Sequence, residues 1–80
     1  MVDRLLGKKV IGIKQSTKSL KNGEGKCLYI AKDAQGELVK PVEDLASSVG
    51  VEIKYVDTMK DLGKLCGIDV GAAVTLLLKD

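Results

Sequence analysis

The side chains best suited to chemistry lie in residues 12–18, which read GIKQSTK. Gly12 opens this run at the point where a strand is expected to turn into a helix, and such a turn directs free backbone amides and the positive end of the helix dipole outward. Lys14 and Lys18 are four residues apart, so both can reach the same side of that helix. Gln15 carries a planar amide that can pair with a base edge. The run predicts an anion- and base-binding turn or, alternatively, an ordinary solvated turn.

A second segment of interest lies near the end of the chain, where a helical pattern stops at Gly67. Ile68 and Val70 then flank Asp69 in what should be an exposed loop, and Gly71 follows. Loops seldom expose branched apolar residues without a reason, and the two glycines suit tight turns. The loop is therefore predicted to contact a partner or, alternatively, to cover the edge of a sheet.

Catalytic and metal-binding constellations are missing from the sequence. Histidine is absent, Cys27 and Cys66 are far apart, and neither a Walker sequence nor a dinucleotide-binding fingerprint occurs. Both cysteines are expected to be small core residues. Carboxylates that could serve catalysis have a capping or loop role instead: Asp33, Asp57, Asp61 and Asp69. We expect no enzyme, no metal, no cofactor and no small-molecule substrate.

Positive charge is concentrated in the first half of the chain. Residues 1–40 carry a net charge of +5 and residues 41–80 a net charge of −3. A basic half suits nucleic-acid binding, although many solvated surfaces have the same composition. The 80 residues fit a single domain, 1–80, with no apolar run long enough to cross a membrane and no signal-peptide core. We expect a cytoplasmic protein.

Four strands are predicted from the apolar runs at residues 10–13, 27–31, 51–55 and 73–78. The second run is continuously apolar, which is typical of a strand covered on both faces. The third alternates with charged residues, which is typical of a strand near an edge with one wet face.

Helical patterns fill the gaps between these strands, and a short helical piece precedes the first. One helix should be capped by Ser16 or Thr17 and end at Asn22. The next should hold Pro41 in its first turn. Its apolar face should comprise Val42, Leu45, Ala46 and Val49, before a stop at Gly50. The last should be capped by Thr58, with Asp61 in the capping-box position and a buried stripe of Met59, Leu62, Leu65 and Cys66.

This order of elements predicts an α/β fold, a three-layer α/β/α sandwich around a four-stranded mixed sheet. If residues 12–18 and residues 68–70 bind the same ligand, the end of strand one and the start of strand four must lie together. Strand four should then run antiparallel to strand one.

The run from Gly12 to Lys18 resembles a motif of the kink-turn-binding ribosomal-protein family, the "seven-Ae" family. Archaeal members have Gly-Thr-Asn-Glu-x-x-Lys, and small bacterial members of the YbxF type have the more similar Gly-Thr-Lys-Gln-x-x-Lys. The resemblance implies that Lys14 and Gln15 contact guanines of tandem sheared G·A pairs and that Lys18 contacts a backbone phosphate. Ile13 replaces the threonine of the family, which leaves any hydroxyl contact there open.

Two further segments extend the resemblance over residues 10–78. Ile68-Asp69-Val70 is similar to the Ile-Glu-Val or Ile-Asp-Val of the family, which packs against the extruded nucleotides of the kink. Lys32, in the segment after strand two, agrees with bacterial members and is either a further phosphate contact or an ordinary surface lysine.

The resemblance implies a monomeric RNA-binding protein that recognises a kink-turn and stabilises its bent form. The natural target could be ribosomal RNA, a riboswitch or another structured RNA. The alternative is a protein-interaction module of the same fold that docks through Ile68 and Val70. Binding to RNA should weaken steeply with salt, whereas docking to a protein should not.

Overall fold

The computed structural model describes residues 7–79, and the expected helical piece before residue 10 lies largely outside them. Strands and helices alternate along the described residues, as predicted. The elements are β1 (Lys9–Ile11), α1 (Ile13–Lys21), β2 (Gly25–Ala31), α2 (Gly36–Ser48), β3 (Glu52–Val56), α3 (Met59–Cys66) and β4 (Val74–Leu78).

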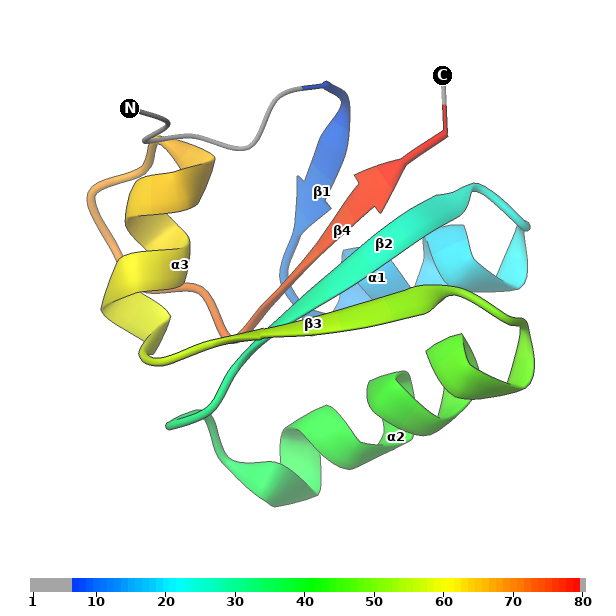
Figure 1. Ribbon diagram of the computed structural model, residues 1–80, viewed down its shortest axis with the longest axis horizontal. Coiled ribbons are helices and arrows are strands. Elements are labelled where there is room, and N and C mark those ends of the chain that lie inside the picture. The colour runs from blue at the N-terminus through cyan, green and yellow to red at the C-terminus, as the bar shows by residue number, and fades with distance from the viewer. Residues whose placement is uncertain (1–6, 80) are drawn as a thin grey trace.

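The four strands form one mixed sheet in the order β1-β4-β2-β3 (Figure 1). β4 runs antiparallel to both of its neighbours, and β2 and β3 are parallel. β3 lies at an edge, as its alternating pattern predicted. β1 and β4 pair antiparallel, with Ile11 opposite Thr75, which confirms the orientation expected for strands one and four.

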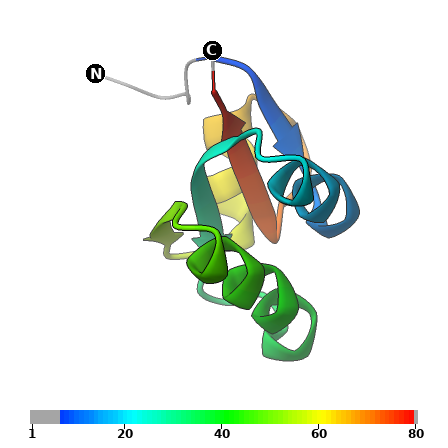
Figure 2. The same ribbon diagram turned by 90° about the vertical axis from the view of Figure 1, so that its right-hand side faces the viewer.

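Helices cover both faces of the sheet. α1 and α2 lie side by side over one face (Figure 2), where Leu20 and Val42 pack on Leu28 and Leu76. α3 covers part of the other face, where Leu62 packs with Ala31. Because successive strand residues point to opposite faces, the continuous run in β2 serves both cores. The α/β/α sandwich is confirmed.

The start of α1 differs from the sequence expectation. The apolar run at residues 10–13 is interrupted by Gly12, which has φ +104° and ends the strand at Ile11. Ile13 is therefore the first residue of the helix and packs against the core beneath it. Neither Ser16 nor Thr17 caps the helix, because both lie inside it, and Ser16 is fully buried. The predicted end at Asn22 is confirmed.

α2 begins at Gly36, which is earlier than predicted. Pro41 is therefore an interior residue of the helix and not part of its first turn. Pro41 offers no N–H to the carbonyl of Glu37, but both residues are exposed and water can replace that bond. Val42 and Ala46 are buried as expected, whereas Val49 follows the helix and is 48% exposed.

The start of α3 agrees with its prediction. The Thr58 hydroxyl accepts a hydrogen bond from the Asp61 amide, with N···O 3.0 Å, and Leu62 is fully buried. Met59 is 37% exposed, so the buried stripe is narrower than predicted. In β3, Tyr55 is also mainly exposed, and its hydroxyl donates to the Glu43 carboxylate of α2.

Candidate nucleic-acid interface

Three strand ends meet at one end of the sheet, which we call the motif end. The Gly12 amide donates to the Val74 carbonyl across 3.0 Å, so the end of β1 is fastened to the start of β4. The Ala31 amide donates to the Ala73 carbonyl across 2.9 Å, which fastens the end of β2 to the same place. The structure therefore brings the turn at Gly12 and the segment before β4 together, although about 60 residues separate them in sequence.

Gly12 is required by its backbone conformation. With φ +104° and ψ 159°, it occupies a region that side-chain-bearing residues rarely adopt, while the space around its α-carbon is open. It supplies no side-chain cap, and the first turn of α1 contains no acidic residue. The positive end of the α1 dipole therefore remains unneutralised by a carboxylate of that turn.

α1 presents the predicted side chains to solvent. Lys14, Gln15 and Lys18 are all exposed, whereas the opposite side of the helix is buried. A shallow open groove of about 380 Å³ runs along the exposed side, lined by Ile13, Lys14, Thr17, Lys18 and Lys21. Sequence reasoning missed Thr17 and Lys21 as lining residues. The spacing of Lys14, Lys18 and Lys21 on one helix could have identified Lys21.

The loop between α3 and β4 is packed against α3. Gly67, at φ +76°, ends the helix in the left-handed conformation, and the Ile68 amide donates to the Gly63 carbonyl across 3.0 Å. An added Cβ at Gly63 would lie 2.1 Å from the carbonyl oxygen of Val70. Gly63 is thus a positioning residue for this loop that the sequence analysis missed, and its place inside a helix was the available signal.

The loop residues differ in exposure. Asp69 is exposed and Val70 is 69% exposed, as expected for a contact surface. Ile68 is half-buried and packs against the core cluster around Leu62. Gly71 does not have a positive φ, so the expectation of a turn there is wrong. It instead permits close approach, because an added Cβ would lie 3.2 Å from the Met59 Cβ.

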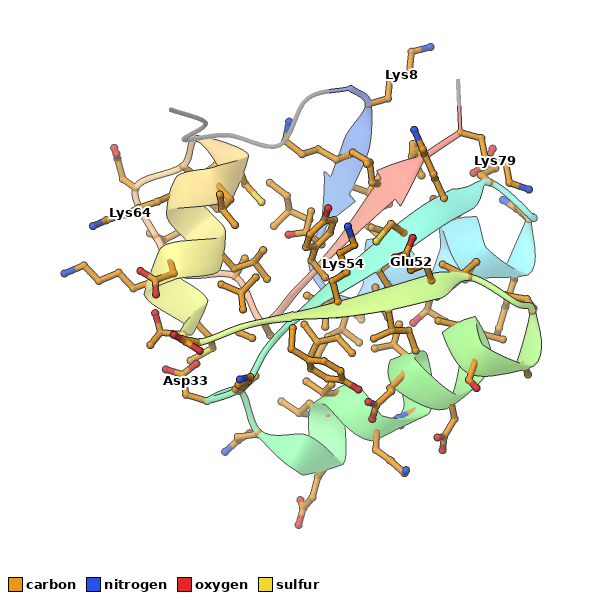
Figure 3. All side chains as sticks on the ribbon, viewed as in Figure 1. Lys8, Asp33, Glu52, Lys54, Lys64 and Lys79 are labelled. Atoms are coloured by element: carbon orange, nitrogen blue, oxygen red, sulfur yellow. The ribbon has the colours of Figure 1, made fainter. Side chains whose placement is uncertain are left out.

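Lys32 lies at the motif end directly after β2 and is exposed. Its Nζ lies 3.6 Å from a carboxylate oxygen of Asp57, and both side chains are largely in solvent. Such a pair is weak enough for a phosphate to replace the carboxylate. The neighbouring Asp33 has a structural role, since its carboxylate accepts from the Met59 amide across 2.7 Å at the start of α3 (Figure 3).

The cysteines belong to the interior, as predicted. Cys27 is buried, and burial raises the pKa of its thiol. Cys66 is half-buried, with its sulfur 3.0 Å from the Thr75 hydroxyl. Within residues 7–79 no group of three or more potential ligands among His, Cys, Asp and Glu could hold a metal ion. None of the helices in the same range is long and apolar enough to cross a membrane.

The fold and the two segments at the motif end define a small α/β/α domain with a basic helix and a fixed apolar loop. Residues 5–80 match the model of the ribosomal protein L7Ae/L30e/S12e/Gadd45 family, and the chain belongs to this family.

Several relatives have similar length. An RNA-binding protein of Halalkalibacterium halodurans is 53% identical over 70 residues, covering 88% of this chain and 85% of that protein. The RNA-binding protein YbxF of Geobacillus stearothermophilus is 42% identical over 73 residues, covering 91% and 89%. Both relatives are RNA-binding proteins, and this agrees with the prediction of no catalytic activity.

Solved structures share the fold. The Giardia lamblia 15.5kD RNA binding protein superposes with a TM-score of 0.84 at 23% identity, covering 90% of this chain and 61% of that one. A protein of unknown function from Bacillus halodurans gives a TM-score of 0.80 at 22% identity, covering 89% and 71%. At these identities the likeness concerns the fold.

Proposed function

We propose that this protein binds RNA, recognises a kink-turn and stabilises its bent form. The observation that carries the proposal is the meeting of the Gly12 turn and the loop before β4 at one end of the sheet, held by the bond from the Gly12 amide to Val74. The family match and the RNA-binding relatives support the same function. A bent RNA with unstacked nucleotides offers both phosphates and bases to such a surface.

Each exposed group at the motif end has a role in this proposal. Gln15 pairs with a base edge of the tandem G·A region, and Lys14 contacts the neighbouring guanine. Lys18 contacts backbone phosphate, and Lys32 contributes a further phosphate contact after it leaves Asp57.

In the loop before β4, one branched side chain contributes more to RNA binding than the other. Val70 is the more exposed of its two branched residues and supplies apolar contact to an extruded nucleotide, while Ile68 holds the loop in place. Asp69 lies between them at the surface. We expect the protein to act as a cytoplasmic monomer without a cofactor.

Affinity for a kinked RNA with tandem sheared G·A pairs, compared with a straight duplex, tests this proposal. Wild type should prefer the kinked RNA, and Gln15→Ala should weaken that binding by about 1 to 3 kcal/mol through loss of a base contact. Lys18→Ala should reduce affinity for both RNAs. It should also make the slope of log affinity against log salt concentration shallower by about one, because one phosphate contact is lost. Titrations over a range of salt concentrations measure both effects.

Gln35→Ala is the matched control, because Gln35 is exposed and its side chain does not cap α2. It should bind the kinked RNA as wild type does. Base reading by Gln15 would be wrong if both glutamine variants bound equally well. Equal affinity of wild type for kinked and straight RNA would reject kink recognition, and a lack of RNA binding would favour the protein-interaction module.

A further inference from the structure

Asp33 connects two segments that lie far apart in the sequence. Its carboxylate accepts a hydrogen bond from the Met59 amide, with N···O 2.7 Å, although 26 residues separate them. Met59 is the first residue of α3, so its amide has no partner within the helix. The carboxylate also lies at the positive end of the α3 dipole (Figure 3), which strengthens the bond. The turn after β2 is therefore fastened to the start of α3.

Met59 in turn holds the loop before β4. Its carbonyl accepts a hydrogen bond from the Ala72 amide across 3.0 Å. An added Cβ at Gly71 would lie 3.2 Å from the Met59 Cβ, so the loop and α3 are in close contact there. Val70 directly precedes these two loop residues, and its side chain is 69% exposed. The position of Val70 therefore depends on Met59, which Asp33 holds in place.

The same turn carries Lys32, the proposed phosphate contact that precedes Asp33 in the chain. The Lys32 amide donates to the Val56 carbonyl across 2.8 Å, so the backbone of the turn is also bonded to the end of β3. The Lys32 ammonium group is free to move in solvent, whereas the Asp33 carboxylate is bonded to a backbone amide. Asp33 thus links a proposed phosphate contact to the loop that contains Val70.

The charge of Asp33 argues against direct contact with RNA. A carboxylate beside a phosphate contact repels the RNA backbone, so loss of this charge alone should increase affinity. Loss of the hydrogen bond to Met59 should have the opposite effect if the position of the loop matters for binding. The two explanations for Asp33 therefore predict changes of opposite sign.

We propose that Asp33 is a positioning residue for kink recognition. It sets the loop before β4 relative to Lys32, so that Val70 meets an extruded nucleotide while Lys32 binds a phosphate. This inference rests on the proposed function and adds to it a residue that acts without touching RNA. The hydrogen bond from Met59 to Asp33 then favours RNA in which the extruded nucleotide and the phosphate have one fixed separation.

The test measures affinity for a kinked RNA with tandem G·A pairs and for a straight duplex. Asp33→Ala should bind the kinked RNA about fivefold more weakly than wild type, because the loop is no longer held in place. Its affinity for the straight duplex should equal or exceed that of wild type, since a negative charge is lost. Asp57→Ala is the matched control, because it removes the same charge beside Lys32 and leaves the bond to Met59 intact. This control should keep the wild-type preference for kinked RNA.

Two conservative variants separate the hydrogen bond from the charge. Asp33→Asn keeps an oxygen acceptor in the same place and should bind the kinked RNA within about twofold of wild type. Asp33→Glu keeps the charge but displaces the carboxylate by one methylene group, so it should bind more weakly than Asp33→Asn. Thermal melting establishes that each variant is folded, and this comparison stands even if Asp33→Ala does not fold.

A double variant tests whether Asp33 acts through the loop. In a Val70→Ser background, Asp33→Ala should weaken binding to the kinked RNA by less than about twofold, because the side chain that Asp33 positions is already absent. The inference is overturned if Asp33→Ala binds the kinked RNA as Asp57→Ala does, or if Asp33→Glu binds it as tightly as Asp33→Asn. An undiminished effect of Asp33→Ala in the Val70→Ser background would also overturn it. If wild type does not prefer the kinked RNA, the proposed function itself has failed.

Discussion

Ile68 and Val70 are neighbours in one loop but have different surroundings. Ile68 is half-buried against the Leu62 cluster, whereas Val70 is 69% exposed. Removing apolar groups from a packed site reduces stability, while substitution of an exposed side chain changes it little. The two residues therefore have separable roles in folding and binding.

Single serine substitutions should separate these roles. Val70→Ser should change the free energy of unfolding by no more than about 0.5 kcal/mol but weaken binding to a kinked RNA. Ile68→Ser should destabilise the fold by roughly 1 kcal/mol or more, because it removes partly buried apolar atoms. Thermal melting and RNA titration of both variants measure the outcome. A large loss of stability in Val70→Ser with RNA affinity intact would reject the contact role of Val70.

Individual residues were predictable where their local pattern was decisive. The capping role of Thr58 was predictable from its hydroxyl and its position before an apolar stripe. The burial of Leu62 was predictable from helical spacing. The place of Gly63 inside a helix marked it in the sequence, but its partner could not be predicted, because the close contact is with a carbonyl seven residues further along the chain. The proposed roles of Lys14, Gln15, Lys18 and Lys32 came from the family resemblance, and they stay predictions.

α3 and the loop that follows it form one interlocked unit. The Val70 carbonyl approaches Gly63, Gly71 approaches Met59, and the Ala72 amide donates to the Met59 carbonyl across 3.0 Å. The close neighbours are backbone atoms of Val70 at Gly63, and the Cβ and backbone of Met59 at Gly71, and a change of rotamer moves none of these atoms.

Gly63→Ala should therefore lower the free energy of unfolding by about 1 to 3 kcal/mol, despite the higher helix propensity of alanine. Gly36→Ala in α2 is the matched control, because no atom lies within 4 Å of an added Cβ there and its φ is not positive. The control should have stability equal to or above that of wild type. Denaturant unfolding compares the two, and equal stability of both variants would show that the loop moves away from α3 at little cost.

Element boundaries were predicted less well than element types. Strand one was predicted to extend to Ile13, because apolar residues on both sides of Gly12 suit a buried strand and a helix start equally well. Similarly, an interior Pro41 is tolerated in α2 because both residues of the lost hydrogen bond face solvent. Solvent exposure of this kind is a tertiary property that local sequence does not reveal.

On the scale of the whole molecule, the face of the sheet that α3 covers also contains two titratable groups with raised pKa values. Burial raises the pKa of Cys27, and nearby Glu52 adds to this effect. Burial also raises the pKa of Tyr29, with a further contribution from Cys27. Both groups are neutral when protonated, so the folded protein retains these protons at a pH where the unfolded chain loses them.

Stability should consequently fall as pH rises above about 9, since the folded state then binds more protons than the unfolded state. Melting temperatures at about pH 7.5 and pH 10 measure the decrease. Cys27→Ala should show a smaller decrease between these pH values, whatever its stability at neutral pH. A decrease identical to that of wild type would mean that Cys27 does not contribute to it.

The topology was predictable because the order of elements and one functional constraint restricted it. Strands alternating with helices require layers, and the need to bring two segments together fixed the direction of β4 relative to β1. The pairing of β4 with β2 on its other side was not predicted, because several strand orders satisfy the same constraint.

The central position of β4 has a consequence for any RNA partner. Its pairing with both β1 and β2 fixes the spacing between the Gly12 turn and the end of β2, and this spacing cannot change without breaking sheet hydrogen bonds. In the proposed complex, the RNA must therefore change its conformation to fit the protein. Apparent affinity then scales with the fraction of RNA molecules that are already bent, so it reports the stiffness of the RNA as well as the contacts of the protein.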